Sequence, residues 1–468
     1  MRRAFLSVAA AAALSACVQG PNYKRPATTP PEAFRDVAPA AAAAPAATST
    51  SIGDAKWWDV FQDDQLQALI KTGLAQNYSV KIAAARIMQA EAQLGISRSA
   101  QYPQASAGVT AGGQRTRQAG VNNGNPVTFG AGQVQGNLSW ELDFWGKFRR
   151  ATEAAQAQVL ATQWGQRAVV TTLISQIANG YFDLRGLDLQ LEITKRTLES
   201  RQESLRLTQV RERGGATSLV DVRQAEQLVY TATSEIAQLE REIAQQENFI
   251  SVLLGNNPSP VTRGRALTEQ PHSTDVPAGL PSTLIERRPD IQQAEQLLVA
   301  ANANIGVARA AYFPQISLTG SGGFQSTALS TLFTGAGAVW TAAAALSQPI
   351  FTAGRTRSQV ALAEAREQEL VLTYQQTIKQ AFREVSDALI GYRKTREFRE
   401  QQALLVGSAQ DARRLAQLRY EGGATSYLEV LDADTRLFSA ELGLAQAQAG
   451  ELASLVEIYR ALGGGWQS

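Results

Sequence analysis

Cysteine and histidine are almost absent from the sequence, which contains one of each in 468 residues. A single cysteine, Cys17, excludes a disulfide framework and any thiolate metal site. A single histidine, His272, cannot supply a catalytic triad or one of the usual histidine-bearing zinc sites. No Gly-rich phosphate loop follows a strand and opens a helix. We therefore expect a protein that is not an enzyme and that holds no cofactor and no metal.

Charge of one sign is not in excess either, because the formal net charge is +2. A nucleic-acid partner therefore has no electrostatic support. Ala, Gln, Leu, Glu and Arg dominate long stretches of the chain. This composition favours extended helices over a compact mixed fold.

The N-terminus contains one apolar run, and it is too short to span a bilayer as a helix. It lies in "MRRAFLSVAAAAALSAC", which has the layout of a secretory signal. The end, "LSAC", resembles the lipobox of bacterial lipoproteins, which predicts that residues 1–16 are removed and that Cys17 is acylated. Val18 in place of Asp favours the outer membrane, by resemblance to bacterial sorting rules. Residues 17–53 are rich in Pro and Ala and predict a lipid-anchored, extended tether.

The chain repeats itself. "QVRERGGATSLVDV" aligns with "QLRYEGGATSYLEV" at an offset of about 208 residues, and Gly146 aligns with Gly354 at the same offset. "LGISRSAQYPQAS" also aligns with "IGVARAAYFPQIS". A repeat this long predicts a duplicated domain rather than a solenoid. We place the two copies at 54–255 and 283–463, with a Pro-rich connector at 256–282 and a tail at 464–468.

Each copy predicts a long helical hairpin. Between Gly146 and about Arg213 there is no proline, and the heptad spacing of Ile177, Leu184, Leu191, Leu198 and Leu205 predicts a helix about 100 Å long. The second copy has the same plan from Gly354 to Tyr420. The GGATS turns end these helices with a left-handed glycine cap and start the next helix with a hydroxyl cap. The turn residues are Gly214, Gly215 and Thr217 or Ser218, and Gly422, Gly423 and Thr425 or Ser426. Nearer the N-terminus, Asp54 is predicted to cap a helix that runs to about Ala100.

Four β-strands are predicted between the helices. "VQGNLSWEL" alternates apolar and polar residues from Val134 over the length of a transmembrane strand, and weaker strands complete two pairs at about 103–142 and 314–350. Four strands cannot close a barrel, and an open edge cannot face lipid. If the strands span a membrane, two chains would give eight strands and three would give twelve. The other interpretation is a pair of soluble hairpins.

These motifs together resemble the TolC-like outer-membrane factors, in their lipoprotein (NodT or OprM-like) branch. They are "GPNYKRP", "WWDVFQDDQLQALI", "LDFWGKFRRATEAA", "VPAGLPSTLIERRPDI", "YFPQISL", "PIFTAGR" and both GGATS turns. The resemblance implies a mainly α-helical homotrimer with a helical barrel in the periplasm, an equatorial domain, and a shared 12-stranded β-barrel in outer-membrane lipid. It also implies a passive exit duct that a periplasmic adaptor (membrane fusion protein) joins to an inner-membrane RND transporter.

The resemblance also implies roles for residues near the GGATS turns. Glu429 and Asp432 match acidic positions that ring the closed periplasmic pore, although a solvated acidic helix face is the other interpretation. Asp221 and Tyr420 match a family latch between neighbouring hairpins, whose arginine is replaced here by Thr425.

Two other functions remain open at this stage. One is the outer duct of a type I protein secretion system, and the other is a non-conducting periplasmic coiled-coil adaptor or scaffold. An adaptor would show one hairpin in a β-rich domain, whereas this chain shows two hairpins, each with a strand pair. The sequence indicates neither the cargo nor the partner pump.

Overall fold

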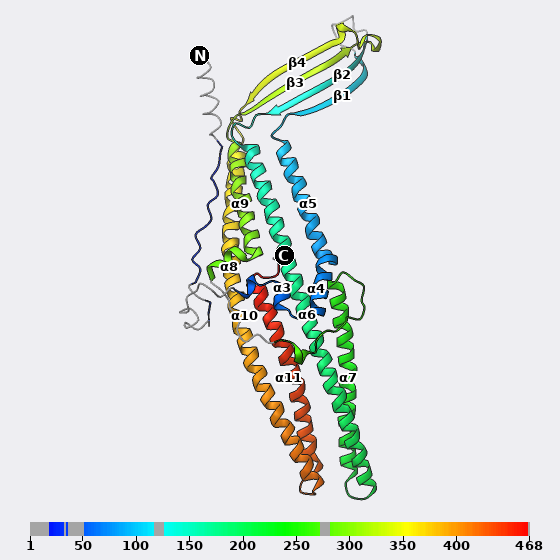
Figure 1. Ribbon diagram of the computed structural model, residues 1–468. Helices are drawn as coiled ribbons and strands as arrows, with labels where there is room; N and C mark the ends of the chain where they lie inside the picture. Colours follow the sequence, from blue (N-terminus) through cyan, green and yellow to red (C-terminus); the bar gives the residue numbers. More distant parts are fainter. Residues whose placement is uncertain (1–17, 32–33, 36–50, 117–125, 272–280, 467–468) are drawn as a thin grey trace. The chain divides into compact units, whose positions relative to one another are not determined.

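The computed structural model describes residues 18–31, 34–35, 51–116, 126–271 and 281–466. Cys17 and His272 lie outside these residues. Figure 1 shows helices and one sheet. In chain order the elements are η1 (Ile52–Asp54), α3 (Trp57–Val60), α4 (Asp64–Gln76), α5 (Tyr78–Ser99), β1 (Gln104–Thr116), β2 (Val127–Glu141), α6 (Lys147–Arg213), α7 (Leu219–Leu253), η3 (Leu267–Glu269), α8 (Pro281–Arg287), α9 (Pro289–Ala310), β3 (Gln315–Ser326), η4 (Leu329–Thr331), η5 (Gly335–Gly337), β4 (Ala338–Ser347), α10 (Arg355–Glu421) and α11 (Tyr427–Ala461).

The sequence repeat is also a repeat of structure. Helices α6 and α10 each have 67 residues, and α7 and α11 each have 35. Glycines at equivalent positions adopt positive φ angles in both copies, a conformation that side chains with a Cβ rarely adopt. The pairs are Gly146 and Gly354, Gly215 and Gly423, and Gly255 and Gly463. The long helices predicted before each GGATS turn are confirmed.

The N-terminal helix differs from the prediction. Asp54 does not cap it, because Asp54 is the last residue of the short helix η1. Asp63 is the N-cap of α4 instead, and its carboxylate accepts from the backbone N–H groups of Gln65 and Leu66. The helical pattern is then interrupted at Asn77, whose side chain accepts from the backbone of α5. An aspartate just before an apolar periodic run is a helix-cap signal. Asp54 and Asp63 both have this signal, so the sequence pattern alone did not distinguish them.

The contacts divide the chain into two compact units. Unit 1 comprises residues up to 27, 86–163 and 293–375, and unit 2 comprises 28–85, 164–292 and 376–468. The divisions fall within the helices α5, α6, α9 and α10. Unit 1 contains the whole sheet, and unit 2 contains both GGATS turns.

Unit 1 has a four-stranded antiparallel sheet with the order β1-β2-β3-β4. The strands have 13, 15, 12 and 10 residues, which is enough for each to cross a bilayer at the usual tilt. Since β2 and β3 come from different copies of the repeat, their pairing joins the two copies into one sheet.

The N-terminal arm forms neither helix nor strand over residues 18–31, and its described residues up to 27 belong to unit 1. The guanidinium of Arg25 donates to both carboxylate oxygens of Glu295 at 2.7 Å. Arg150, itself 6% exposed, donates to the carbonyl of Gln19 and to the side chain of Asn22. The arm therefore docks through charged groups that the folded unit buries.

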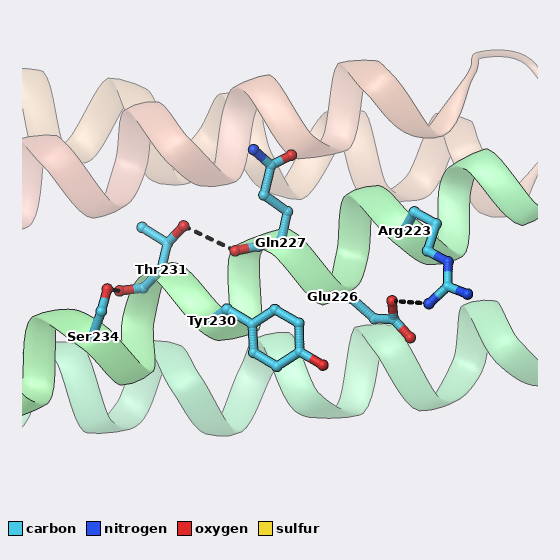
Figure 2. A pocket seen from close by; sticks show the side chains of 6 residues that line it. All are labelled: Arg223, Glu226, Gln227, Tyr230, Thr231 and Ser234. Atoms are coloured by element: carbon cyan, nitrogen blue, oxygen red, sulfur yellow. Dashed lines mark hydrogen bonds and ion pairs between the residues drawn. The ribbon is translucent and has the colours of Figure 1, made fainter.

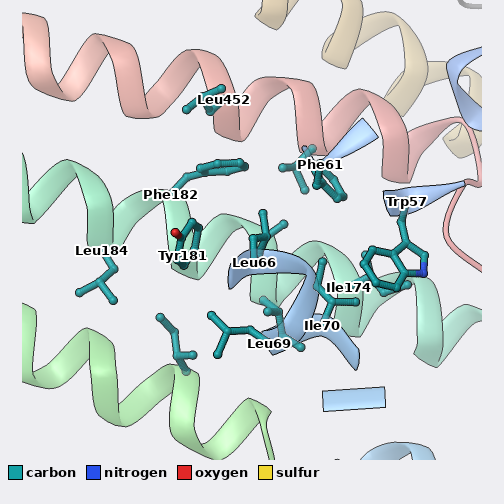
Figure 3. Packing of buried hydrophobic residues seen from close by; sticks show 14 of the residues in the cluster. Trp57, Phe61, Leu66, Leu69, Ile70, Ile174, Tyr181, Phe182, Leu184 and Leu452 are labelled. Atoms are coloured by element: carbon teal, nitrogen blue, oxygen red, sulfur yellow. The ribbon is translucent and has the colours of Figure 1, made fainter. Parts of the chain in front are cut away.

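Unit 2 has an apolar core where α6, α7 and α11 meet the N-terminal helices (Figure 3). Apolar residues of the N-terminal helices are buried here, and Ile177 and Leu184, at the start of the predicted heptad seam, are buried with them. The core contains Trp57, Phe61, Leu66, Leu69, Ile70, Ile174, Ile177, Tyr181, Phe182, Leu184, Leu452 and Tyr459, among others. Farther along α6 the seam leucines are only half-buried.

Among the helices that the structure describes, none is both long and apolar enough to cross a lipid bilayer.

Candidate channel wall and gate residues

The sheet has one continuous apolar face. Directly paired residues of an antiparallel sheet have side chains on the same face, so the register assigns each position to a face. Val134 pairs with Val109 on one side and with Phe324 on the other, and Leu138 pairs with Ala105 and Gly320. Over the main part of the sheet this face is apolar or glycine: Ala105, Ala107, Val109, Val134, Gly136, Leu138, Trp140, Ile316, Leu318, Gly320, Gly322, Phe324, Ala338, Trp340, Ala342, Ala344 and Leu346. Arg115 and Ser326, near the ends of β1 and β3, are polar exceptions on the same face.

The apolar face is uncovered. Val109 is 76% exposed, Trp340 80% and Leu346 67%. A two-sided sheet in water normally buries its apolar face against a second layer. An uncovered face of this extent has the composition of the lipid-facing wall of a membrane barrel.

The opposite face of the sheet is mostly polar. Ser321 and Thr341 are paired across β3 and β4 and share a side-chain hydrogen bond of 2.6 Å. The same face carries Gln104, Ser106, Thr110, Gln133, Gln135, Asn137, Ser139, Glu141, Ser317, Thr319, Gln325 and Ser347. A strand that alternates in this way has a lipid side and a water side, as the sequence predicted for β2.

Strands β1 and β4 are the edges of the sheet, and each pairs on one side only within the described residues. An unpaired edge in hydrocarbon leaves backbone N–H and C=O groups without partners, at several kcal/mol for each group. Strands of other chains must therefore complete the wall.

Both GGATS turns have the backbone that the sequence predicted. Gly215 and Gly423 have φ angles of 74° and 75°. In the first turn the hydroxyl of Ser218 accepts from the backbone of Asp221, and the Asp221 carboxylate accepts from the backbone of Ser218, which is a capping box. In the second turn Ser426 is the N-cap but makes no side-chain cap bond. The turns are thus equivalent in backbone and different in side-chain bonding.

Glu429 and Asp432 both lie in the first two turns of α11, and each has an arginine partner in the same chain. Arg419 donates to Glu429 at 2.6 Å, and Thr425 also donates to this carboxylate. Arg436 donates to Asp432 at 2.7 Å, and this bond raises the pKa of Arg436. All four charged side chains are at least 40% exposed. The predicted acidic ring is therefore a set of exposed ion pairs in the single chain.

Asp221 and Tyr420, the predicted latch, do not bond to each other in this chain. Hydrogen bonds from Thr217 and Ser218 engage the Asp221 carboxylate and lower its pKa. The Tyr420 hydroxyl is buried and has no hydrogen-bond partner among the described residues. Its ring packs 5.2 Å from that of Tyr427. The latch stays a prediction about the assembled protein.

Behind the turns lies an ion pair that the sequence did not indicate. Arg201 of α6 is 3% exposed, and it donates to Asp434 of α11 at 2.9 Å and to the carbonyl of Leu228 at 3.1 Å. Its guanidinium also lies 4.8 Å from the ring centroid of Phe438. No local motif announces a pair whose members are 233 residues apart. By contrast, Arg436 follows Asp432 by four residues, a spacing that predicts a helical ion pair.

The described residues offer no group of three or more His, Cys, Asp or Glu side chains that could hold a metal ion.

Comparison with known proteins agrees with these surfaces. The model of the family "Outer membrane efflux protein" matches residues 69–256 and 280–464, one match for each copy of the repeat. The chain is 34% identical to the cation efflux system protein CusC of Escherichia coli O6:H1 over 457 residues, which cover 98% of this chain and 97% of CusC. It is 37% identical to the outer membrane protein OprJ of Pseudomonas aeruginosa over 476 residues, covering 100% of this chain and 97% of OprJ.

A solved channel has the same fold. The open-state structure of the MtrE outer membrane channel of Neisseria gonorrhoeae superposes with a TM-score of 0.84 at 31% identity. The match covers 96% of this chain and 99% of that one. The family is one of efflux channels and not of enzymes. The uncovered apolar face, the polar face opposite it and the two unpaired edges are what one subunit of such a channel requires, and this chain belongs to the outer membrane efflux protein family.

Proposed function

We propose that this chain conducts small toxic compounds out of the cell as a passive duct, with no catalytic activity of its own. The chain is the outer-membrane channel component of a tripartite efflux system. It acts as a homotrimer, with a periplasmic adaptor and an inner-membrane RND transporter as partners, and it extends from the outer membrane into the periplasm. The observation that carries this function is the two-faced sheet with open edges, because three copies supply the twelve strands of a closed wall.

The mechanism needs only positioning and electrostatics. The apolar face meets lipid, so the polar face lines the lumen and offers hydroxyl and amide groups to water and solutes. Relatives differ in the cargo that their names state, since CusC is a cation efflux protein and TtgC of Pseudomonas putida is a toluene efflux protein. The cargo of this chain belongs to the same broad range, and its selection is a task of the transporter.

The gate is proposed at the GGATS ends of the helices. Rings of Glu429 and Asp432, with one pair from each chain of the trimer, would attract cations. Their arginine partners would reduce the negative electrostatic potential at the constriction. The proposed latch uses the buried Tyr420 hydroxyl, which is free to bond across hairpins, while Asp221 already serves its cap. We also propose that Cys17 carries the lipid anchor and that the two repeats span 54–255 and 283–463.

Single-channel current in a planar bilayer tests the function and the gate. The full-length protein should give a small, cation-selective conductance. In a Glu429→Ala/Asp432→Ala variant, Arg419 and Arg436 lose their partners, so the conductance should grow and cation selectivity should fall. The matched control is Asp411→Ala, which removes an exposed helical ion pair with Arg414 elsewhere on α10.

The outcomes separate channel from gate. Equal currents and selectivity in all three proteins would rule out Glu429 and Asp432 as the constriction but keep the duct. If folded, membrane-inserted trimers of both variants and of the unchanged protein stay silent even with the adaptor added, the duct function is wrong.

A further inference from the structure

Equivalent positions of the two repeats in unit 2 are buried in one copy and exposed in the other. On α11, Tyr427 is 6% exposed and Phe438 8%. Their counterparts on α7, at the offset that relates Gly215 to Gly423, are Leu219 and Tyr230, which are 55% and 68% exposed. Large apolar or aromatic side chains at the same positions of both repeats indicate that both pairs of positions are packing sites. In the single chain, the two positions on α7 therefore have no packing partner.

The buried copy shows what the cover is. The α11 strip (Leu431, Asp434 and Phe438) packs into a groove between α6 and α7, which we call the α6–α7 groove. Where the strip meets α7, the space left is about 10 Å³. A surface pocket of about 620 Å³ borders Asp434 and Phe438 on the side of α10. The groove residues at the seam are Arg201, Ser204, Ala225 and Leu228.

The counterpart of that groove is open. The residues at the equivalent positions line a groove of about 640 Å³ between α10 and α11, the α10–α11 groove. Leu405 of this groove is 50% exposed, whereas its counterpart in the first copy, Thr197, is 9% exposed. The four equivalent residues are Ala409, Ala412, Ala433 and Arg436.

The counterpart of the α11 strip is open too. Figure 2 shows Arg223, Glu226 and Tyr230 along one side of α7, where they line a surface pocket of about 470 Å³. We call these three residues the α7 strip. They stand at the positions of Leu431, Asp434 and Phe438 in the second copy. The chain thus has one closed strip-and-groove seam, and it presents both halves of a second seam unfilled.

Charge matches across the two open halves. In the closed seam the carboxylate of Asp434 is held by Arg201, which also contacts the carbonyl of Leu228. In the open groove the counterpart of Arg201 is Ala409, and the counterpart of Leu228 is Arg436. The open groove therefore has its arginine at the position of Leu228 instead of the position of Arg201. The α7 strip keeps a carboxylate, Glu226, at the position of Asp434.

Size changes in the same direction. Phe438 in the closed seam lies against the long side chain of Arg201. In the open groove the small side chains of Ala409 and Ala412 leave room for Tyr230, which is larger than Phe by a hydroxyl group. Its hydroxyl can reach water at the rim, as a partly buried tyrosine requires.

We propose that the α7 strip of one protein chain fills the α10–α11 groove of the neighbouring chain in the trimer. In this contact Glu226 faces Arg436, and Tyr230 packs over Ala409. The occupant is a second copy of this chain, because each half of the open seam is the sequence counterpart of a half that already fits. Contacts of this kind are head-to-tail, and they close into a ring when the rotation permits. The inference rests on the homotrimer of the proposed function and assigns the residues of its helical interface.

The present partners of these charges do not oppose the new contact. Arg223 donates to Glu226 at 2.7 Å and Arg436 donates to Asp432 at 2.7 Å, each within one helix and with an arginine at least 69% exposed. Such pairs contribute little and are readily shared. Because Arg436 would lie between Glu226 of the neighbour and Asp432 of its own chain, the seam and the proposed gate would share a cation.

Crosslinking of the full-length trimer tests the seam. In a Glu226→Cys/Ala409→Cys variant every copy has one thiol on its strip and one in its groove. A short bis-maleimide crosslinker should then give linked dimers and trimers on denaturing gels, about tenfold above the single variants, because the thiols sit at a high effective concentration. The matched control is Glu203→Cys/Ala409→Cys, which uses an exposed carboxylate position of α6 outside the strip. Cys17 is the same in every variant, and the proposed lipidation occupies its sulfur, so it adds no crosslink that differs between the variants.

Charge exchange provides the second measurement. Glu226→Arg and Arg436→Glu should each increase the fraction of dissociated trimer, measured by mass photometry on dilution in detergent. The double exchange should restore the trimer fraction of the unchanged protein, because the two charges act as a pair. Glu203→Arg should change nothing.

Trimers that show neither the crosslink nor the restoration would overturn the assigned seam and leave the channel intact. Absence of trimers in the unchanged protein would overturn the proposed homotrimer itself.

Discussion

At the residue scale, Asp63 shows how one buried carboxylate joins separate parts of unit 2. It is 1% exposed and caps α4. It also accepts from the hydroxyl of Tyr181 at 2.9 Å, from the side chain of Gln270 at 2.7 Å and from the backbone N–H of Arg265 at 3.0 Å. Burial alone raises the pKa of Asp63, but these hydrogen bonds, with that of Gln270 the largest, outweigh burial and hold the pKa below its usual value.

We predict that Asp63 makes unit 2 sensitive to acid. Since its folded pKa lies below the unfolded value of about 3.9, ionised Asp63 stabilises the fold at neutral pH, and this contribution is lost as the pH falls through the folded pKa. Asp63→Asn should cost about 1–3 kcal/mol at pH 7, because an amide offers a donor where donors already converge. Thermal unfolding followed by circular dichroism at pH 7, 5 and 3 measures both effects.

The neighbouring residue supplies the control for this prediction. Asp64 is exposed in the first turn of the same helix, so Asp64→Asn should keep the unfolding temperature and its pH profile close to those of the unchanged protein. If Asp63→Asn retains the full acid sensitivity of the unchanged protein, the carboxylate at position 63 is not its source.

Local signals predicted some of these residues and missed others. The sequence predicted a hydroxyl cap at Thr217 or Ser218, and Ser218 is the cap. It also predicted the left-handed φ angles of Gly215 and Gly423, because both signals come from residues within one turn. The Asp63 network and the pair of Arg201 with Asp434 join residues from distant parts of the chain. No spacing rule reaches across such separations, so these contacts needed the folded structure.

At the element scale, the N-terminal arm illustrates a segment whose composition was misleading. Many prolines and no helical period predict an extended tether, and residues 18–31 form neither helix nor strand. The same residues are nevertheless docked, because Glu295 is 5% exposed and binds Arg25 of the arm. Arg150 holds the carbonyl of Gln19 in the same way. Composition reports the missing secondary structure, whereas docking depends on charges that α6 and α9 supply.

We predict that Glu295 governs the mobility of the arm. Glu295→Gln removes the bidentate ion pair with Arg25, and because the Arg25 side chain is 48% exposed the loss should be about 1 kcal/mol. Backbone amides of residues 19–26 should then exchange with solvent about fivefold faster. Hydrogen exchange followed by mass spectrometry on the intact trimer measures this. The matched control, Glu364→Gln, breaks an exposed ion pair with Arg309 in the same unit and should leave the arm unchanged. Unchanged exchange in Glu295→Gln would mean that other contacts hold the arm.

At the scale of the whole molecule, duplication is the feature that the sequence announces most clearly, and the structure uses it in two ways. In the sheet, strands of both copies pair directly, so β2 meets β3. In the hairpins, the α11 strip of the second repeat packs into the α6–α7 groove of the first repeat. The α7 strip and the α10–α11 groove stay uncovered in the single chain. The sequence predicted four strands and two hairpins from alternation and heptads, which are local periods. It could not predict which faces were already filled, because that depends on pairing across the repeat.

The two faces of the sheet lead to the last prediction. Leu138 and Asn137 are adjacent in β2 and point to opposite faces, since Leu138 pairs with Ala105 and Asn137 with Ser106. Leu138→Arg places a charge toward lipid, which costs about 2–4 kcal/mol near the bilayer midplane for each copy. Asn137→Arg places the same charge toward the lumen, where water reaches it. Heat-resistant trimer in outer-membrane fractions should therefore fall in Leu138→Arg and persist in Asn137→Arg.

The lumen variant also has a positive signature. Arginine at position 137 in each copy adds a ring of positive charge to the polar face, so single-channel current should shift from cations toward anions. Leu138→Arg protein that does insert should keep the original selectivity, because its charge lies outside the wall. If the two variants exchanged these behaviours, the faces would be assigned the wrong way round, with the apolar side toward the lumen. Since a one-residue shift in the register of β2 would produce that exchange, this pair of adjacent residues tests the register of the wall.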